Sequence, residues 1–160
     1  MGARPQRIIE CYNKFKDFHR ISKDKVAVLD AGCGLDSAVS RYYCDREVIT
    51  IDPQLEKSDG LGIRGVAEFL PIRTNSLDVV ITVSSMDHMF DRDKFIEEAH
   101  RVLKAGKSMF VAMGLDRMDS IHMWHSTKDD FIKAFDKRFT AVRWDFTHNA
   151  VHSFIEVKRK

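Results

Sequence analysis

The first segment of this sequence that could do chemistry is an apolar run followed by an acid and two closely spaced glycines. It reads V-L-D-A-G-C-G-L-D and spans Val28–Asp36. Because glycine has no side chain, a ligand can approach the backbone closely at such a turn. A helix beginning near Ser37 would point free N–H groups at the same place. The pattern predicts a nucleotide-like cofactor, although a G-x-G turn also occurs where a strand and a helix merely pack tightly.

A second acid follows the next apolar run, which reads I-T-I-D-P. Asp52 comes 18 residues after Gly34, a spacing at which an acid can accept hydrogen bonds from both ribose hydroxyls of a nucleotide. The alternative is a turn acid, since Asp52-Pro53 is also a common way to leave a strand. The buried run before Asp52 favours ribose binding.

The elements that must position these acids alternate between strands and helices. Short apolar runs, typical of strands in a mainly parallel sheet, lie at residues 26–29, 48–51, 79–83 and 109–113, with a weaker run at 63–67. Helical spacing predicts helices over about 8–18, over a segment capped by Asp91 and ended by Ala105-Gly106, and from a capping box at 126–129 to about Arg138. Two alternating segments, 140–146 and 151–157, predict a closing antiparallel hairpin.

Composition is that of an ordinary globular domain. The 160 residues are 44% hydrophobic, and 26 Lys plus Arg nearly balance 24 Asp plus Glu, so bulk charge indicates neither nucleic acid nor membrane as a partner. The sequence has no apolar run of about 18 residues and no secretory signal at its start, which predicts a cytoplasmic protein without a membrane partner. Cys11, Cys33 and Cys44 lack C-x-x-C spacing, so we expect reduced thiols and no metal site.

Four blocks of the sequence resemble the class I S-adenosylmethionine-dependent methyltransferases, in particular the branch called type 11. In chain order they cover about Val26 to Met113, and they are V-L-D-A-G-C-G-L-D, I-T-I-D-P, A-E-F-L-P-I-R-T-N-S-L-D-V-V-I-T-V-S-S-M-D-H-M and E-E-A-H-R-V-L-K-A-G-K-S-M-F-V-A-M. The resemblance implies an α/β fold: a Rossmann-like, seven-stranded, mostly parallel sheet with helices on both faces in three layers and a C-terminal antiparallel hairpin. We expect one minimal methyltransferase domain over residues 1–160. It would have an N-terminal helix at 1–24, a cofactor-binding half at 25–113 and a substrate-side part at 114–160.

The resemblance also implies S-adenosylmethionine as the cofactor and S-adenosylhomocysteine as its product. Asp30 would orient the methionine amino group, and Asp52 would hold the ribose hydroxyls. Pro53 would lie against the adenine, with further donor contacts at Ser84. Backbone contacts to the donor would come from the turn residues Ala31, Gly32, Cys33 and Gly34.

One position departs from the family pattern on the adenine side. An acid that bonds the adenine amino group commonly precedes the Ala-Glu pair of the third strand, and here Val66 occupies its place. The N–H of Ala67 can still reach the ring. Loss of one charge-assisted hydrogen bond should weaken binding by roughly 1.5–3 kcal/mol if nothing replaces it.

The residues nearest the chemistry would follow the fourth strand, at Ser84, Ser85, Asp87 and His88. Methyl transfer from a sulfonium is an in-line displacement, so alignment and desolvation can supply much of the rate. A base is needed only if the acceptor must lose a proton early. His88 is the first candidate for that base, with Asp87 beside it, but a histidine here can equally line the pocket or bond neighbouring backbone.

The loop after the fifth strand would border the acceptor. His122, Trp124 and His125 could embrace a flat substrate there, or the loop could simply cover the sheet edge. The absence of an Asn-Pro-Pro-aromatic tetrad after the fourth strand argues against methylation of DNA-base amines. Small molecules, RNA and protein side chains stay open as acceptors.

Two other functions are consistent with the same residues. One is a catalytically silent S-adenosylmethionine-binding or regulatory subunit, suggested by Val66 and by the minimal lid, which would leave an open pocket for a protein partner or a second copy to complete. The other is a nicotinamide-dependent oxidoreductase. That alternative is weaker, because the third glycine of a G-x-G-x-x-G turn would fall at Ser37.

Overall fold

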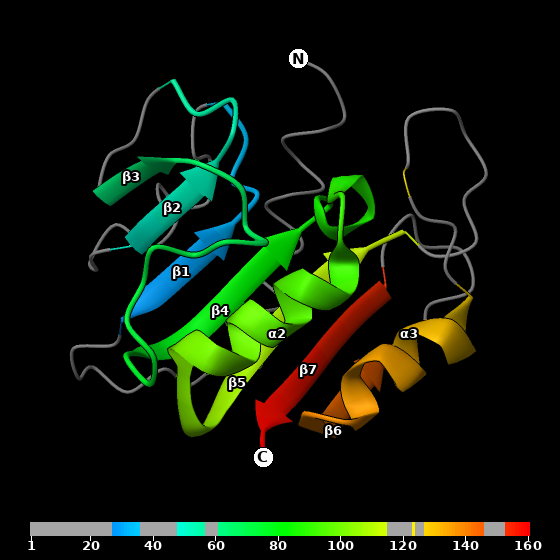
Figure 1. The fold of residues 1–160 in the computed structure, drawn as a ribbon. Helices are drawn as coiled ribbons and strands as arrows, with labels where there is room; N and C mark the ends of the chain where they lie inside the picture. The colour runs from blue at the N-terminus through cyan, green and yellow to red at the C-terminus, as the bar shows by residue number, and fades with distance from the viewer. Residues whose placement is uncertain (1–26, 36–47, 57–60, 115–122, 124–126, 146–152) are drawn as a thin grey trace.

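A computed structural model describes residues 27–35, 48–56, 61–114, 123, 127–145 and 153–160 of the chain. Within these residues the chain forms one seven-stranded sheet in the order β3-β2-β1-β4-β5-β7-β6 (Figure 1). The strands are β1 Val28–Ala31, β2 Val48–Asp52, β3 Leu61–Arg64, β4 Leu77–Val83, β5 Leu103–Met113, β6 Phe139–Asp145 and β7 Ser153–Arg159. The predicted seven-stranded Rossmann-like sheet is confirmed.

The direction of chain winding reverses in the middle of this sheet. Strands β1 to β5 pair in parallel, and β1 lies between β2 on one side and β4 on the other. Loops that leave β1 and β4 at such a switch point diverge and open a crevice at the carboxyl ends of the strands. β7 runs antiparallel to both β5 and β6, which confirms the closing hairpin.

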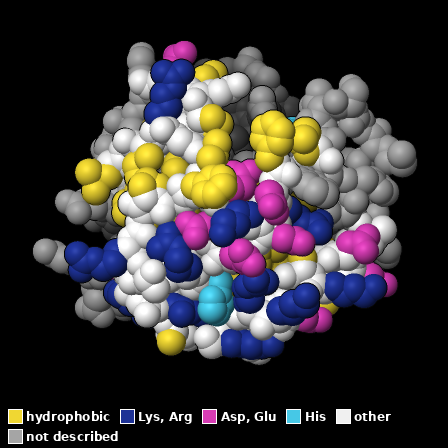
Figure 2. All heavy atoms as spheres, in the orientation of Figure 1, with side chains coloured by type: hydrophobic (Ala, Val, Ile, Leu, Met, Phe, Trp, Pro, Cys, Tyr) yellow, Lys and Arg dark blue, Asp and Glu magenta, His cyan; other side chains and the backbone are white. Residues whose placement is uncertain are grey.

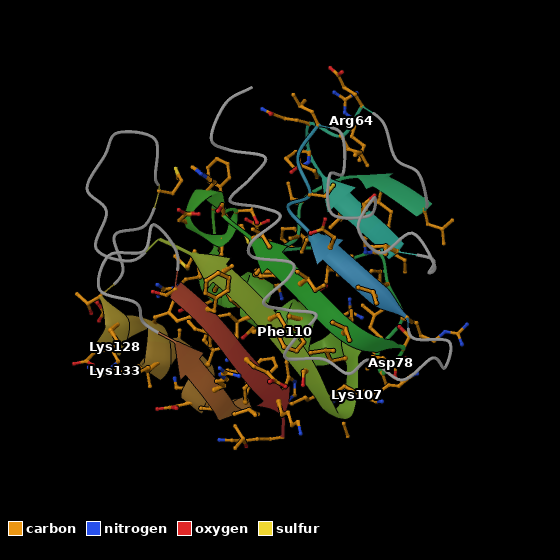
Figure 3. The ribbon with its side chains drawn as sticks, turned by 180° about the vertical axis from the view of Figure 1, so that it is seen from behind. Arg64, Asp78, Lys107, Phe110, Lys128 and Lys133 are labelled. Carbon is orange, nitrogen blue, oxygen red and sulfur yellow. The ribbon has the colours of Figure 1, made fainter. Side chains whose placement is uncertain are left out.

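Two described helices, α2 (Arg92–Val102) and α3 (Lys128–Asp136), lie against the same face of the sheet (Figures 1 and 3). The Asp91 carboxylate accepts the N–H of Lys94 at 2.8 Å, so the predicted cap of α2 is confirmed. Neither helix is long and apolar enough to cross a membrane. The predicted helix at residues 1–24 lies outside the described residues.

Several element boundaries differ from the prediction. Helix α2 ends at Val102 rather than at Ala105-Gly106, because Leu103 already pairs with Leu77 and β5 follows the helix directly. Strand β1 starts at Val28, two residues later than expected, since the N–H of Ala27 donates to the Asp78 carboxylate at 3.1 Å.

Two further boundaries are also corrected. The weak third run forms a strand at Leu61–Arg64, four residues long, because the N–H of Gly65 turns back to the carbonyl of Asp52 at 3.2 Å. The capping box of α3 uses Thr127 and Asp130, one residue later than expected.

Arg101 connects two of the sequence blocks that carry the family resemblance. It lies in the fourth block and bonds residues of the third. Its guanidinium donates to the carbonyls of Leu70 at 2.9 Å and Ile72 at 2.8 Å, and to Glu98 at 2.7 Å. The Glu98 carboxylate in turn accepts the N–H of Leu70 at 2.9 Å, and its pKa is lowered mainly by Arg101. These residues of α2 therefore hold the segment between β3 and β4 against the helix.

We expect Arg101→Ala to lower the free energy of unfolding by about 2–4 kcal/mol, because it removes the charged donor that bonds two backbone carbonyls and leaves Glu98 without its cation. Urea denaturation measures the change. The control is Lys94→Ala, which breaks the more exposed pair with Glu97 and should cost less than about 1 kcal/mol. Equal losses of stability in both variants would contradict the role of Arg101 in holding the segment between β3 and β4.

Asp78 anchors the opposite edge of the sheet from the predicted cofactor site (Figure 3). Its carboxylate pairs with Lys104 at 3.1 Å and Lys107 at 3.3 Å, and the hydrogen bond from Ala27 helps to lower its pKa against the raising effect of burial. The amino ends of β1, β4 and β5 are thus tied together. The acids of the predicted cofactor site, Asp30 and Asp52, lie at the opposite, carboxyl ends of the strands.

Candidate active site

The turn after β1 is shaped by two glycines with opposite surroundings. Gly32 has φ +76° and donates its N–H to the carbonyl of Ile51 at 2.8 Å. A Cβ on Gly32 would lie 2.4 Å from Cβ and Oγ of Ser85, so a side chain there is excluded by contact as well as by conformation. Gly34 has φ +78°, and a Cβ there would meet no atom of the described residues within 4 Å. The turn is closed at Gly32 and open at Gly34.

Asp52 is bonded directly to this turn. Its Oδ2 accepts the N–H of Gly34 at 2.9 Å, and its Oδ1 accepts the N–H of Gln54 at 2.8 Å. Each carboxylate oxygen can accept a second hydrogen bond, and the side chain is only partly buried. The two acids and the glycine turn predicted from the sequence therefore meet at one end of β1 and β2, and Asp52 keeps acceptor capacity for a ligand.

Asp30 differs from Asp52 in its surroundings. It is completely buried near the end of β1, and among the residues that the structure describes neither of its carboxylate oxygens has a hydrogen-bond partner. Burial, and secondarily the charge of Asp52, raises its pKa well above the usual value for an aspartate. Such a group is costly unless it is protonated or a cation stands near it.

The thiol of Cys33 lies in the same turn. Burial and the charges of Asp30 and Asp52 raise its pKa to about 12. Because the thiolate is the reactive form, Cys33 stays an unreactive thiol near neutral pH. Its contribution to the turn is its backbone, whose N–H donates to the carbonyl of Ile51 at 3.3 Å.

The loop after β4 folds back onto the glycine turn. Ser84 has φ +50°, an uncommon value for a residue other than glycine, and donates its N–H to the carbonyl of Ala112 at 2.7 Å. The Ser85 hydroxyl donates to the carbonyl of Ala31 at 3.1 Å and lies 2.7 Å from the hydroxyl of Thr82. The sequence placed Ser85 near the chemistry without a role and did not single out Thr82. The only signal was two hydroxyls three residues apart at a strand end.

Both predicted catalytic side chains lie on a short 3-10 helix, η2 (Met86–His88), directly after this loop. Asp87 is buried, whereas His88 is exposed. The N–H of His88 donates to the carbonyl of Ser85 at 3.0 Å, and the carbonyl of Asp87 accepts the N–H of Met123 at 2.8 Å. Met123 thus contacts η2 through its backbone.

The residues after β3 form the remaining part of the predicted site. Val66 is 40% exposed and its carbonyl accepts the N–H of Phe69 at 3.2 Å, whereas Ala67 is buried. The buried Glu68 carboxylate accepts the N–H of Phe90 at 2.8 Å, which ties this turn to the start of α2. Pro53 is exposed at the end of β2. The three predicted substrate residues, His122, Trp124 and His125, lie outside the described residues.

Together, the sheet order with its reversal beside β1, the glycine turn after β1 and the acid at the end of β2 are those of a Rossmann-like domain. A sequence model of one family, described as a methyltransferase domain of type 11, matches residues 29–111. The chain belongs to this methyltransferase family, and the predicted resemblance to the class I S-adenosylmethionine-dependent enzymes is confirmed. S-adenosylmethionine is the cofactor of that class.

Individual relatives agree with the family. Norajmaline N-methyltransferase of Rauvolfia serpentina is 28% identical over 106 residues, which are 56% of this chain and 36% of the relative. The chain thus matches about a third of the length of that enzyme.

Two solved structures share the fold. One is a methyltransferase in complex with the Haloferax volcanii Trm112 methyltransferase activator, with a TM-score of 0.76, 15% identity and coverage of 98% of this chain and 93% of the other. The second is Burkholderia thailandensis 1,6-didemethyltoxoflavin-N1-methyltransferase with its substrate and S-adenosylhomocysteine bound, with a TM-score of 0.70, 10% identity and coverage of 98% and 87%.

Proposed function

We propose that this protein transfers the methyl group of S-adenosylmethionine to an acceptor by in-line displacement. The observation that carries the proposal is the Asp52 carboxylate bonded to the Gly34 N–H at 2.9 Å, at a glycine that no other described residue crowds. This arrangement offers acceptors for a ribose and room for a ligand against the backbone. Family membership selects a methyl donor over a nicotinamide dinucleotide.

Features of the turn support the fit of this cofactor. The buried Asp30 carboxylate has no hydrogen-bond partner within the described part of the chain, and the amino group of the donor's methionine would bring a positive charge to this end of β1. Ala31, Gly32, Cys33 and Gly34 would contact the donor through their backbone. Ser84 would contribute from the loop after β4, with Pro53 and Ala67 against the adenine.

When bound, the cofactor supplies a methyl group already activated on a sulfonium. The protein's task is then to hold the acceptor in line and to exclude water. η2 would place Asp87 and His88 near the acceptor, with His88 taking a proton where the acceptor carries one. The His88 side chain is exposed.

We expect His88→Ala to leave the dissociation constant for S-adenosylmethionine within about twofold of the parent, because its N–H still bonds Ser85 and its side chain is exposed. Turnover should fall by roughly 10²–10⁴-fold if the imidazole is the base. Calorimetry measures the first quantity and S-adenosylhomocysteine production the second.

His100→Ala is the matched control for that variant, since His100 of α2 packs edge-on against Phe139 of β6 and its loss should not affect turnover. Full turnover in His88→Ala would assign His88 to pocket lining instead.

We expect Val66→Asp to tighten S-adenosylmethionine binding, because a carboxylate at this exposed position would accept a hydrogen bond from the adenine amino group. A gain of roughly 1.5–3 kcal/mol corresponds to about 10–150-fold in affinity. S-inosylhomocysteine, which lacks that amino group, should not gain. If both nucleosides gain equally, or neither does, the adenine does not lie beside Val66.

The class of acceptor is best found by following the methyl group. We propose incubating the protein with methyl-labelled S-adenosylmethionine and separate pools of small metabolites, RNA and protein, with Asp52→Ala as the blank. Label above the blank in one pool would name the acceptor class. If the parent binds the donor but labels no pool, a silent binding subunit becomes the better assignment.

A partner protein would complete the acceptor site. Phe69 is 71% exposed and Phe90 is 81% exposed, although Glu68 joins their two segments. Figure 2 shows apolar side chains gathered on the upper part of this face, above a belt of charged ones. Large exposed apolar side chains often mark a contact surface. The relative in complex with an activator makes an activating partner, rather than a second copy, the first one to test.

A further inference from the structure

A directed chain of hydroxyls ends on the cofactor turn. The Ser85 hydroxyl carries one proton and donates it to the carbonyl of Ala31 at 3.1 Å. The Thr82 hydroxyl lies 2.7 Å from the same Ser85 oxygen, so Thr82 must be the donor of that second bond. Thr82 is completely buried in β4, which gives the chain a fixed origin.

Ser85 also packs against the turn. Since a Cβ on Gly32 would overlap Ser85 at 2.4 Å, the missing side chain of Gly32 is what allows Ser85 to approach. The left-handed conformation of Ser84, anchored by its bond to Ala112, turns the loop back toward β1. Ser85 is therefore held on the turn by hydrogen bonds, by packing and by the backbone.

The opposite side of Ser85 begins η2. Its carbonyl accepts the N–H of His88 at 3.0 Å, so Ser85 caps the start of that short helix. Movement of the glycine turn would thus reach His88 through a single residue. The separation in sequence is large, since Ala31 and Ser85 are 54 positions apart.

We infer that Ser85 is a positioning residue that couples the cofactor turn to η2, so that an occupied turn sets the placement of Asp87 and His88. The inference rests on the proposed function, because it takes the turn to be where the donor binds. Ser85 itself need not touch the donor or the acceptor. Its hydroxyl and its carbonyl link two segments that otherwise belong to different strands.

Amide chemical shifts test this coupling without knowledge of the acceptor. S-adenosylhomocysteine is added to ¹⁵N-labelled protein, and the amide signals of Gly34 and His88 are followed. In the parent both signals should move with the same dissociation constant. In Ser85→Ala the Gly34 signal should still move, whereas the His88 shift should fall to less than half of its parent value.

Thr82 provides a second pair of variants in case Ser85→Ala does not fold. Thr82→Val keeps the shape and removes the donor, so it should also reduce the His88 response. Thr82→Ser restores the hydroxyl and should restore the response. Ser108→Ala is the control, because it removes a buried hydroxyl that bonds Glu156 and lies away from the turn.

The outcomes separate the two proposals. If Gly34 in the parent does not respond to S-adenosylhomocysteine, the proposed function fails. If Gly34 responds but the His88 shift is unchanged in both Ser85→Ala and Thr82→Val, the coupling role fails while the cofactor site stands. If the His88 shift is lost in Ser108→Ala as well, the loss reflects a general loosening of the fold. That result would also overturn the role of Ser85.

Discussion

Asp52→Ala is expected to abolish measurable binding of S-adenosylmethionine. The carboxylate would accept hydrogen bonds from two ribose hydroxyls, and charge-assisted hydrogen bonds of this kind contribute roughly 1.5–3 kcal/mol each. The variant also releases the N–H groups of Gly34 and Gln54, which Asp52 now holds. Calorimetry should show affinity at least about 100-fold weaker than that of the parent.

The control for this variant is Asp93→Ala, which removes an exposed acid on α2. Its affinity for the donor should match the parent. The thermal unfolding of Asp52→Ala should be measured beside the titration. A disrupted turn would lower the unfolding temperature, whereas the loss of a ligand contact alone would not. A folded Asp52→Ala that binds S-adenosylmethionine as tightly as the parent would show that the ribose lies elsewhere.

Gly32→Ala is expected to be the most destabilising single-methyl change in the described turn. The left-handed backbone costs an alanine roughly 1–2 kcal/mol, and the overlap with Ser85 adds about 1–3 kcal/mol of overpacking. We therefore expect a loss of about 2–5 kcal/mol in the free energy of unfolding, measured with urea. Cofactor binding should be lost with it, because the turn must shift.

Two other glycines separate the causes of that effect. Gly106→Ala has a similar positive φ with open space around the new Cβ, so it should cost only the backbone strain of about 1–2 kcal/mol. Gly34→Ala should cost about the same in stability but weaken cofactor binding, since its Cβ enters the space proposed for the donor. If Gly32→Ala unfolds no more easily than Gly106→Ala, Ser85 does not close the turn.

Local patterns in the sequence predicted the cofactor end of the fold well. Asp30 and Asp52 lie near the ends of β1 and β2 and the glycines follow β1, and parallel pairing brings these two strand ends together without further information. The closing hairpin could be predicted equally well, because alternating apolar and polar residues in two adjacent segments indicate antiparallel strands. The pairing of β7 with β5 then places the hairpin at the end of the parallel sheet.

The contacts between distant segments could not be predicted in the same way. The glycine pair suggested a ligand, but only the structure distinguishes Gly32, closed by Ser85, from Gly34, open to a ligand. Ala105-Gly106 indicated a helix end, yet tertiary pairing of Leu103 with Leu77 ended the helix earlier. No local pattern in the sequence indicates that Arg101 bonds the backbone carbonyls of Leu70 and Ile72, which lie 31 and 29 positions away.

Titration of the protein with S-adenosylmethionine in a calorimeter tests the proposed cofactor site most directly. We expect saturable binding of one molecule per chain, inhibited by S-adenosylhomocysteine and lost in Asp52→Ala. A nicotinamide dinucleotide should give no heat of binding. Tight binding of the dinucleotide with no response to S-adenosylmethionine would contradict the assignment of this turn as a methyl-donor site.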